Sequence, residues 1–201
     1  LDVHPRALGV AQEAPVEAAP VADDAPPVAE QPVQEPPATD IPASPDTAAP
    51  PVATDARFDG YGDMRFGMTA DEAKQAWGGE LNSYEFEDKK SCFHLWPKGQ
   101  KNSAQLAFMF VDGKFARYSS ESPVLLAPGG GRIGMTGAEI DKLYSGRIER
   151  QPHKYTDGEY LRIKNGENVL IFETDAKGDA GKVGEWRVGR TPAIDYVEGC
   201  A

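Results

Sequence analysis

The chain has 201 residues, a formal net charge of −11 and a sequence pI near 4.7. The acidity is confined to one end, because residues 1–55 hold ten Asp or Glu and one Arg while the rest of the chain is nearly neutral. No stripe of Lys and Arg is visible, so we expect no nucleic-acid partner. No apolar run approaches the ~20 residues that a membrane-spanning helix needs.

The first segment has the composition of a disordered linker. Residues 1–55 contain 12 of the 17 prolines and none of the aromatic residues. Such a segment buries too little apolar surface to offset the entropy of ordering its backbone. We therefore predict an extended acidic tether over residues 1–55 that holds a folded region away from an attachment point; a tail without that role is the alternative. Because the sequence starts at Leu1 and not at Met, we expect a leader that these residues do not include.

Two cysteines, Cys92 and Cys200, are the only ones in the chain. Such a pair indicates a disulfide if the compartment is oxidising and two free thiols if it is the cytosol. A bond between them would fix the end of the chain to a strand in its middle.

A seven-residue motif occurs twice after the linker, at Phe66–Glu72 and at Ile133–Glu139, an offset of 67 residues. Both copies contain Gly-Met-Thr. Each copy is followed, at the same offset, by a pair of residues that tolerate a positive φ where a short helix would end. These pairs are Gly78-Gly79 and Ser145-Gly146. We infer an internal repeat.

Each copy of the motif contains a capping box, in which Thr is followed three residues later by Glu. The boxes are Thr69 with Glu72 and Thr136 with Glu139. In a capping box the Thr side chain and the Glu side chain satisfy free amides at the start of a helix. The sequence therefore predicts two helices that begin just after these threonines.

Segments typical of strands follow each helix, with Asp-Gly or Asn-Gly turns between some of them. They comprise residues 92–96, 104–111 and 114–120 in the first copy and residues 160–164, 168–174 and 183–190 in the second. We predict an α+β fold of two tandem units, each a helix plus a three-stranded antiparallel meander, preceded by the disordered tether. The predicted domains are the linker 1–55, unit one 56–127 and unit two 128–201, with residues 128–131 as the hinge.

Catalytic signatures are weak. His94 and His153 are the only histidines after the linker, and neither lies in a known Ser or Cys motif. Cys92 and His94 share one side of a strand, but a disulfide explains Cys92 more simply. The acidic residues at 175–179 lack the ligand spacing and the closing Glu of a calcium-binding loop. We expect no enzymatic activity, no cofactor and no metal site.

A protein-binding surface is the remaining candidate site. Alternation along the strands directs one set of side chains away from the helices. That set is aromatic and basic, and it comprises His94, Trp96, Tyr160, Arg162 and Lys164. Exposed aromatic and Arg side chains are frequent anchors of protein interfaces. The alternative is that the linker or the other unit covers Trp96 and Tyr160.

The repeat of a hydrophobic residue, Gly-Met-Thr, a short helix ending at Gly and three strands resembles the tandem units of the β-lactamase inhibitory protein family. The same unit occurs singly in the BamE/SmpA outer-membrane assembly lipoproteins. The resemblance is specific only at Phe66–Glu72, at Ile133–Glu139 and at the glycines that end the helices. It implies a secreted or periplasmic protein, not an enzyme, that grips another protein with a concave sheet.

The resemblance also implies a bacterial envelope lipoprotein whose tether follows a lipidated cysteine, which is not among these residues. The inhibitory proteins have disulfides within their repeats, whereas Cys92 and Cys200 would link two units, so specific inhibitor contacts do not transfer. We therefore expect a periplasmic protein-binding module, an inhibitor or immunity protein that occludes a secreted toxin or a cell-wall enzyme. The alternatives are an envelope-assembly scaffold lipoprotein and a carbohydrate-binding module. The expected partner is another protein, with the membrane involved only through such an anchor.

Overall fold

The computed structural model describes residues 55–200, so all but the last residue of the predicted linker lies outside the described part. The described chain forms an eight-stranded antiparallel sheet, a small three-stranded sheet and two short α-helices. The elements are β1 (Ala56–Arg57), β2 (Gly60–Tyr61), β3 (Met64–Arg65), α1 (Ala70–Trp77), β4 (Leu81–Ser83), β5 (Cys92–Pro97), β6 (Ala107–Val111), β7 (Lys114–Ser120), α2 (Gly137–Leu143), β8 (Ile148–Pro152), β9 (Glu159–Asn165), β10 (Asn168–Thr174), β11 (Val183–Arg190) and the 3-10 helix η1 (Ala193–Asp195). Neither described helix is long and apolar enough to cross a membrane.

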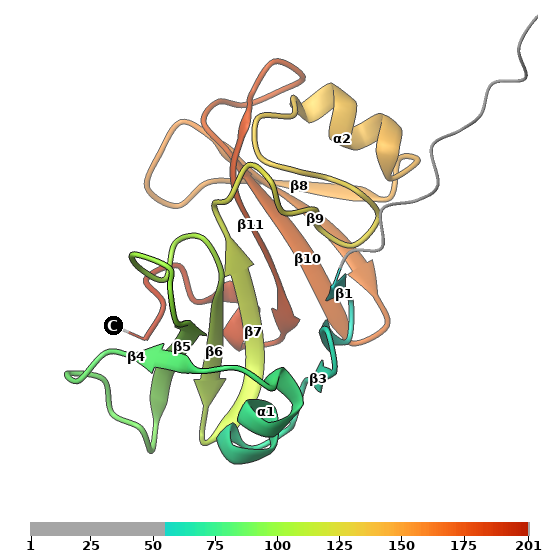
Figure 1. Cartoon of the computed structure of the whole chain (residues 1–201). Helices are drawn as coiled ribbons and strands as arrows, with labels where there is room; N and C mark the ends of the chain where they lie inside the picture. Colours follow the sequence, from blue (N-terminus) through green and yellow to red (C-terminus); the bar gives the residue numbers. More distant parts are fainter. Residues whose placement is uncertain (1–54, 201) are drawn as a thin grey trace, which may run out of the picture. The chain divides into compact units, whose positions relative to one another are not determined.

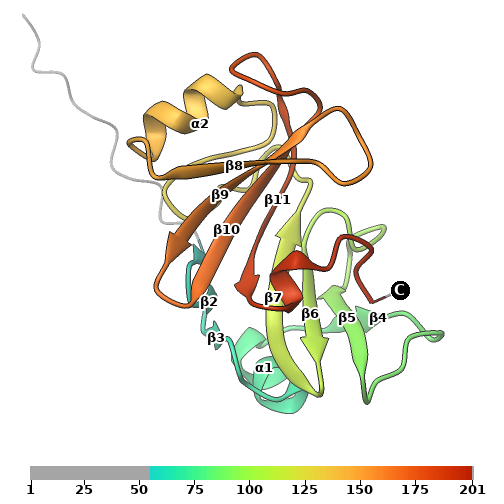
Figure 2. The same cartoon turned by 180° about the vertical axis from the view of Figure 1, so that it is seen from behind.

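The large sheet has the strand order β4-β5-β6-β7-β11-β10-β9-β8. Its first four strands and its last four strands therefore meet where β7 pairs with β11, with Tyr118 opposite Val188 and Ser120 opposite Trp186. Figure 1 shows α1 and α2 on one side of this sheet, and Figure 2 shows the C-terminal segment crossing in front of β7 on the other side.

The prediction of two tandem helix-plus-three-stranded meander units is wrong. Each helix is followed by four strands and not three, and all eight strands belong to one continuous sheet, so the described chain is mostly β. The six predicted strands are present, but β4 and β8 were not predicted. Both are edge strands, with no fully buried residue, and lack the apolar alternation that marks a strand in sequence.

Both helices begin at the predicted capping boxes. The Glu72 side chain accepts from the Thr69 amide at 2.7 Å, and the Glu72 amide donates to the Thr69 hydroxyl at 3.3 Å. The box of Thr136 and Glu139 has the same geometry, with distances of 2.8 and 3.3 Å. Helix α1 ends at Gly78, whose φ of 71° is readily adopted by glycine.

The main core lies between the helices and the large sheet. It is rich in aromatic side chains from the central strands, and its fully buried members include Phe108, Phe110, Tyr118, Phe172 and Trp186. From the helices, Ala73 and Ile140 are fully buried against it. Because each fully buried large side chain contributes about 2 kcal/mol, this single core holds both halves of the sheet together.

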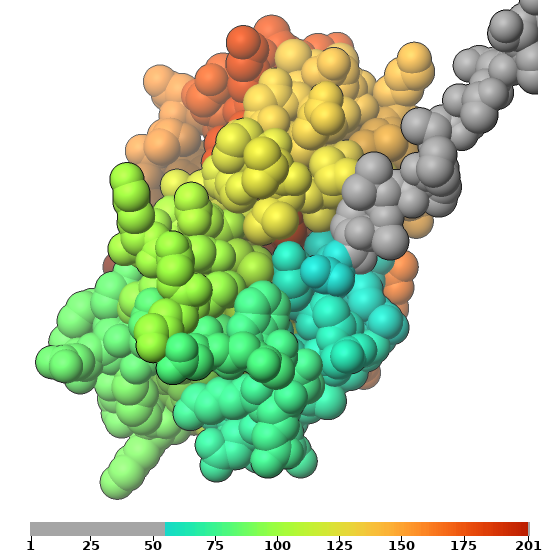
Figure 3. Space-filling model, viewed as in Figure 1, coloured from blue at the N-terminus to red at the C-terminus, as the bar shows by residue number. Residues whose placement is uncertain are grey.

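The small sheet closes one side of this core. Tyr61 lies 5.3 Å from Tyr118, ring centre to ring centre, and Met64 is fully buried. The hydroxyl of Tyr118 donates to the main-chain oxygen of Arg57 at 2.7 Å. Figure 3 shows this part of the chain, in cyan, packed between the green and the yellow segments.

The segment predicted as a hinge is packed against the core. The Tyr144 hydroxyl donates to the Pro128 carbonyl at 2.7 Å and accepts from the Gly131 amide at 3.2 Å. A Cβ atom at Gly131 would lie 2.3 Å from the ring of Phe172. The glycine is therefore required by close packing and not by flexibility.

Candidate functional site

The C-terminal residues 191–200, which we call the strap, cross the middle of the sheet face that the helices leave free, in front of β7 (Figure 2). The strap includes η1 and ends at Cys200. Ile194 is fully buried in a second, smaller apolar cluster together with Tyr160, Val169 and Ile171. This face of the sheet thus has its own small core under the strap.

Two buried arginines hold the strap to the sheet. Arg117 Nη1 donates to the main-chain oxygen of Tyr196 at 2.6 Å and to that of Ala193 at 3.3 Å. Arg187 Nε donates to the main-chain oxygen of Ile194 at 3.0 Å. The two arginines are 6% and 2% exposed, so these charge-assisted bonds form away from water.

The buried arginines belong to a network of charges. Arg187 Nη1 pairs with Glu173 and lies 3.6 Å from a carboxylate oxygen of Glu185. Burial, together with the charge of Arg117, lowers the pKa of Arg187 to about 10. Burial also raises the pKa of Glu185 to about 7; Arg117 opposes this rise and Glu121 adds to it.

Cys92 and Cys200 form a disulfide, which confirms the first of the two expectations for this pair of cysteines. It ties the end of the strap to β5 across a sequence separation of 108 residues. Disulfides persist in oxidising compartments, so the bond is consistent with a secreted or periplasmic protein. Since Cys92 has no free thiol, the Cys92 and His94 pair is not a nucleophile and its base.

His94 is held by a carboxylate. Its Nδ1 lies 2.6 Å from Glu87 Oε1, and its amide donates to Glu87 Oε2 at 2.7 Å. Within the described residues, Glu87, His94 and Cys200 are the group of potential metal ligands that lie within 4.8 Å of one another. The sulfur of Cys200 is in the disulfide and offers no thiolate, so the group has too few ligands for a metal site.

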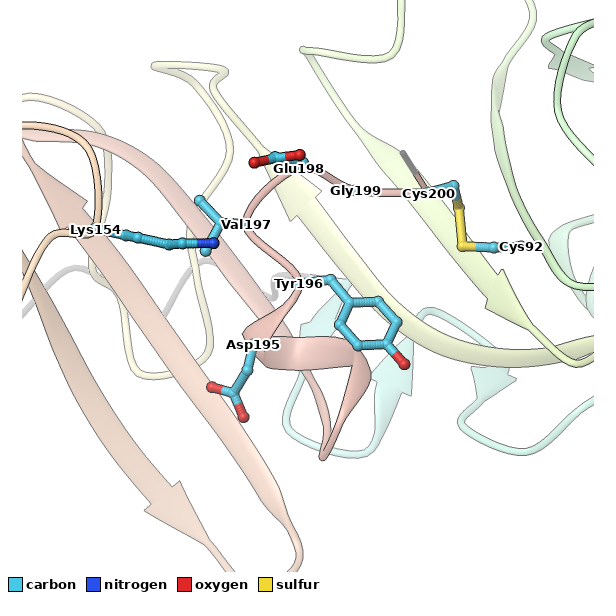
Figure 4. A pocket seen from close by; sticks show the side chains of 8 residues that line it. All are labelled: Cys92, Lys154, Asp195, Tyr196, Val197, Glu198, Gly199 and Cys200. Carbon is cyan, nitrogen blue, oxygen red and sulfur yellow. A yellow bond between two sulfur atoms is a disulfide. The ribbon is translucent and has the colours of Figure 1, made fainter.

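Three hollows surround the strap. The first has a volume of about 410 Å³ and is shown in Figure 4, where Lys154 and Glu198 lie near its rim and the disulfide marks one end. The second, of about 690 Å³, lies between the strap and residues 84–91. The third, of about 330 Å³, lies over β7 and β11 and is lined mainly by polar atoms.

An aromatic stack stands beside the second hollow. Tyr84 lies 4.4 Å from Trp96 and 5.0 Å from Phe86, ring centre to ring centre. Phe86, the outermost ring, is 83% exposed, the most exposed of the large apolar side chains in residues 55–200. The loop that carries it is anchored at Glu87 by His94.

The structure does not bring the five predicted surface residues together. His94 and Trp96 lie on β5, whereas Tyr160, Arg162 and Lys164 lie on β9. Four strands lie between β5 and β9 in the sheet, so the two are five strand spacings apart, which at about 4.8 Å per spacing is about 24 Å.

The prediction that both aromatic residues are exposed is wrong. Trp96 and Tyr160 are each 7% exposed, because Tyr84 covers the first and because the ring of His153 and the strap cluster cover the second. Arg162 is half-buried and pairs with Asp195 of the strap at 2.6 Å. Lys164 is exposed and pairs with Glu149 at 3.2 Å.

Sequence reasoning missed the residues that matter most at this face. Alternation along β11 does place Glu185 and Arg187 opposite to Trp186 and Val188, so their side of the sheet was predictable. Nothing local indicates that the strap returns over them, because that contact joins residues far apart in the chain. Phe86 lies in an irregular loop, where alternation gives no signal.

Comparison with known proteins shows little. No family model matches the chain, and no curated protein sequence matches it. Among solved structures, the uncharacterized protein yfeY from Escherichia coli is 14% identical, with a TM-score of 0.48 over 68% of this chain and 99% of that one. A Bacillus anthracis extracellular protein with an SCP domain is 9% identical, with a TM-score of 0.39 over 62% of this chain and 44% of that one. The DUF4309 family protein YjgB from Bacillus subtilis is 13% identical, with a TM-score of 0.36 over 61% of this chain and 78% of that one. Likenesses this distant assign neither a family nor a function.

Proposed function

We propose that this chain is a protein-binding module, without catalytic activity, of an oxidising compartment outside the cytoplasm. The observation that carries the proposal is the exposure of Phe86 at the tip of the Phe86–Tyr84–Trp96 stack. A large ring held out in water costs free energy in the isolated protein, and burial against a partner recovers about 2 kcal/mol. Exposed aromatic side chains are frequent energetic centres of protein interfaces.

The surroundings of Phe86 favour a rigid binding site. Tyr84 Oη and Ser103 Oγ lie 2.9 Å apart, and Glu87 holds the loop to β5 through His94. The hollow of about 690 Å³ beside the ring offers a concave surface next to the aromatic anchor. Occlusion of a secreted toxin or a cell-wall enzyme is one form that such binding takes.

Site-specific photocrosslinking tests the proposal. A photoreactive phenylalanine derivative at position 86 is expected to form an adduct with one protein in an extracytoplasmic extract, and mass spectrometry identifies that protein. The matched control carries the same group at position 124, because Val124 is 82% exposed and apolar but lies outside the hollows at the strap.

The substitution Phe86→Ala should then weaken binding of the identified protein at least tenfold, whereas Val124→Ala should leave the affinity unchanged. Equal crosslinking at both positions, or an affinity that Phe86→Ala does not alter, contradicts the proposal.

A carbohydrate-binding module is the second candidate, favoured by the open face of the same aromatic stack. Sugar rings stack on aromatic side chains, and Asp88, Ser91 and Ser103 line the hollow beside it with groups that form hydrogen bonds. Glycan-array binding that Phe86→Ala abolishes, with no protein adduct at position 86, would favour this candidate over the first.

A further inference from the structure

We propose that reduction of the disulfide creates a zinc site at the end of the strap. Its ligands are Cys92, Cys200, His94 and Glu87. In the oxidised protein both sulfurs are in the disulfide, so the group lacks thiolates. In the reduced protein the same side chains offer two thiolates, an imidazole and a carboxylate, which are the ligand types that zinc takes in proteins. The ion then holds the strap to β5 in place of the covalent bond.

The four side chains already converge on one place. The potential ligand atoms of Glu87, His94 and Cys200 all lie within 4.8 Å of one another. The sulfur of Cys92 is bonded to that of Cys200 and belongs to the same cluster. Ligand atoms around one zinc ion lie about 2.0 to 2.3 Å from the metal and hence roughly 3 to 4 Å from one another. The cluster therefore needs only small movements to surround an ion.

Two of the ligands are fixed before an ion binds. Glu87 Oε2 accepts from the His94 amide at 2.7 Å, and Glu87 Oε1 lies 2.6 Å from His94 Nδ1. The two side chains are only 14% and 7% exposed for His94 and Glu87, so water screens their attraction to an ion less than at an open surface. Ligands that their neighbours orient in this way bind metal more tightly than free ones.

Cys200 stays near the cluster when the disulfide opens, because the strap is held by other bonds. Arg117 Nη1 donates to the main-chain oxygen of Tyr196 at 2.6 Å. The hydroxyl of Tyr155 donates to the carboxylate of Glu198, which lies two residues before Cys200. The reduced thiol therefore remains within reach of the other three ligands.

The disulfide is open to a reductant. Cys92 and Cys200 are half-buried, and both line the hollows of about 410 and 690 Å³ (Figure 4). A dithiol supplies the two electrons: one of its sulfurs attacks the disulfide, the second closes the dithiol's own disulfide, and both cysteines are left as thiols. Zinc then replaces the two thiol protons, which pass to the solvent.

Metal titration of the full chain tests the inference. The protein is reduced with dithiothreitol, freed of it without oxygen, and titrated with zinc against a chromophoric chelator. We expect the reduced parent to bind one equivalent at least tenfold more tightly than the oxidised parent. Cobalt in place of zinc should give a thiolate-to-cobalt charge-transfer band in the near ultraviolet, since thiolates of the protein are its ligands. Amide NMR of the reduced zinc complex should keep the dispersed signals of the folded chain.

Variants identify the ligands. His94→Gln should weaken zinc binding by the reduced protein at least tenfold. The matched control is His153→Gln, the same change at a half-buried histidine that lines neither of the two hollows, and it should bind as the parent does. Cys92→Ser/Cys200→Ser keeps every other side chain and should show no charge-transfer band.

Equal zinc affinity of the oxidised and reduced parent overturns the inference, as does equal affinity of His94→Gln and His153→Gln or a zinc complex with the NMR spectrum of an unfolded chain. The cobalt band of the parent needs no variant and decides the matter even if His94→Gln does not fold. The inference is also separate from the proposed function: crosslinking at position 86 uses the oxidised protein, so either result stands without the other.

Discussion

Arg117 on β7 donates a hydrogen bond of 2.6 Å to the main-chain oxygen of Tyr196 in the strap. The bond joins the first half of the large sheet to the last residues of the described chain. Together with the disulfide, it makes the strap a fixed part of the molecule.

Removal of the disulfide should lower the free energy of unfolding. Cys92→Ser/Cys200→Ser opens a loop with a sequence separation of 108 residues, for which chain entropy gives about 4 to 5 kcal/mol. Urea unfolding measures the change. A reducing agent should cause a similar loss in the parent and none in the double variant. If the reduced parent unfolds at the same urea concentration as the oxidised parent, the strap does not depend on the bond.

Glu185→Gln should stabilise the protein at high pH. Burial raises the pKa of Glu185 to about 7, above its unfolded value near 4.5, so its favourable contribution is complete below pH 4.5 and is lost as the pH rises through 7. The variant should therefore have a higher Tm than the parent at pH 8 and nearly the same Tm at pH 4. Glu167→Gln, an exposed substitution in the turn between β9 and β10, is the control. A Tm difference that does not vary with pH contradicts a raised pKa for Glu185.

His153 should be neutral at pH 7 with its proton on Nε2. Its Nδ1 accepts from the amides of Tyr155 and Thr156, both at 3.1 Å, and its Nε2 lies 3.2 Å from Glu173. Burial and the charge of Arg187 lower its pKa below the ordinary 6.5.

Because the folded-state pKa of His153 is depressed, its contribution to stability is present above pH 6.5 and is lost as the pH falls through the folded value. Long-range 15N NMR of the imidazole reports the tautomer and the pKa. Protonation above pH 6.5, or a proton on Nδ1 at neutral pH, disagrees with this geometry.

The capping boxes should each contribute about 1 kcal/mol to the free energy of unfolding. Thr69→Ala and Thr136→Ala remove the side-chain oxygens that accept at the helix starts. Thr69→Ser and Thr136→Ser keep an oxygen in place and should retain nearly all of the stability. Chemical denaturation compares the four variants, and equal losses for Ala and Ser would show that the hydroxyls are not the cause.

Gly131→Ala should destabilise the protein by about 1 to 3 kcal/mol, because the added methyl group would lie 2.3 Å from the ring of Phe172. Gly184→Ala on β11 is the matched control, since no atom lies within 4 Å of its added Cβ. Thermal unfolding measures both. A tolerant position 131 would favour the flexible hinge that the sequence suggests.

Part of the fold follows from local signals in the sequence. The two Thr-x-x-Glu boxes and the residues that end the helices specify α1 and α2 because their hydrogen bonds join residues three or four positions apart. The turns at Asp112-Gly113 and Asn165-Gly166 likewise define two hairpins. The short edge strands β4 and β8 give no such signal, since half-exposed strands made mostly of polar residues resemble loops in sequence.

The sequence by itself determined the two helix starts, six of the strands and the pair of cysteines able to bond. Only the tertiary structure decided that β7 and β11 join all strands into one sheet, that Tyr84 and the strap bury Trp96 and Tyr160, and that Glu121 and Glu185 face each other. The physical reason is distance along the chain: a cap or a turn is stabilised by neighbouring residues, whereas these contacts join residues that the sequence separates by about 12 to 80 positions and that only the folded core brings together.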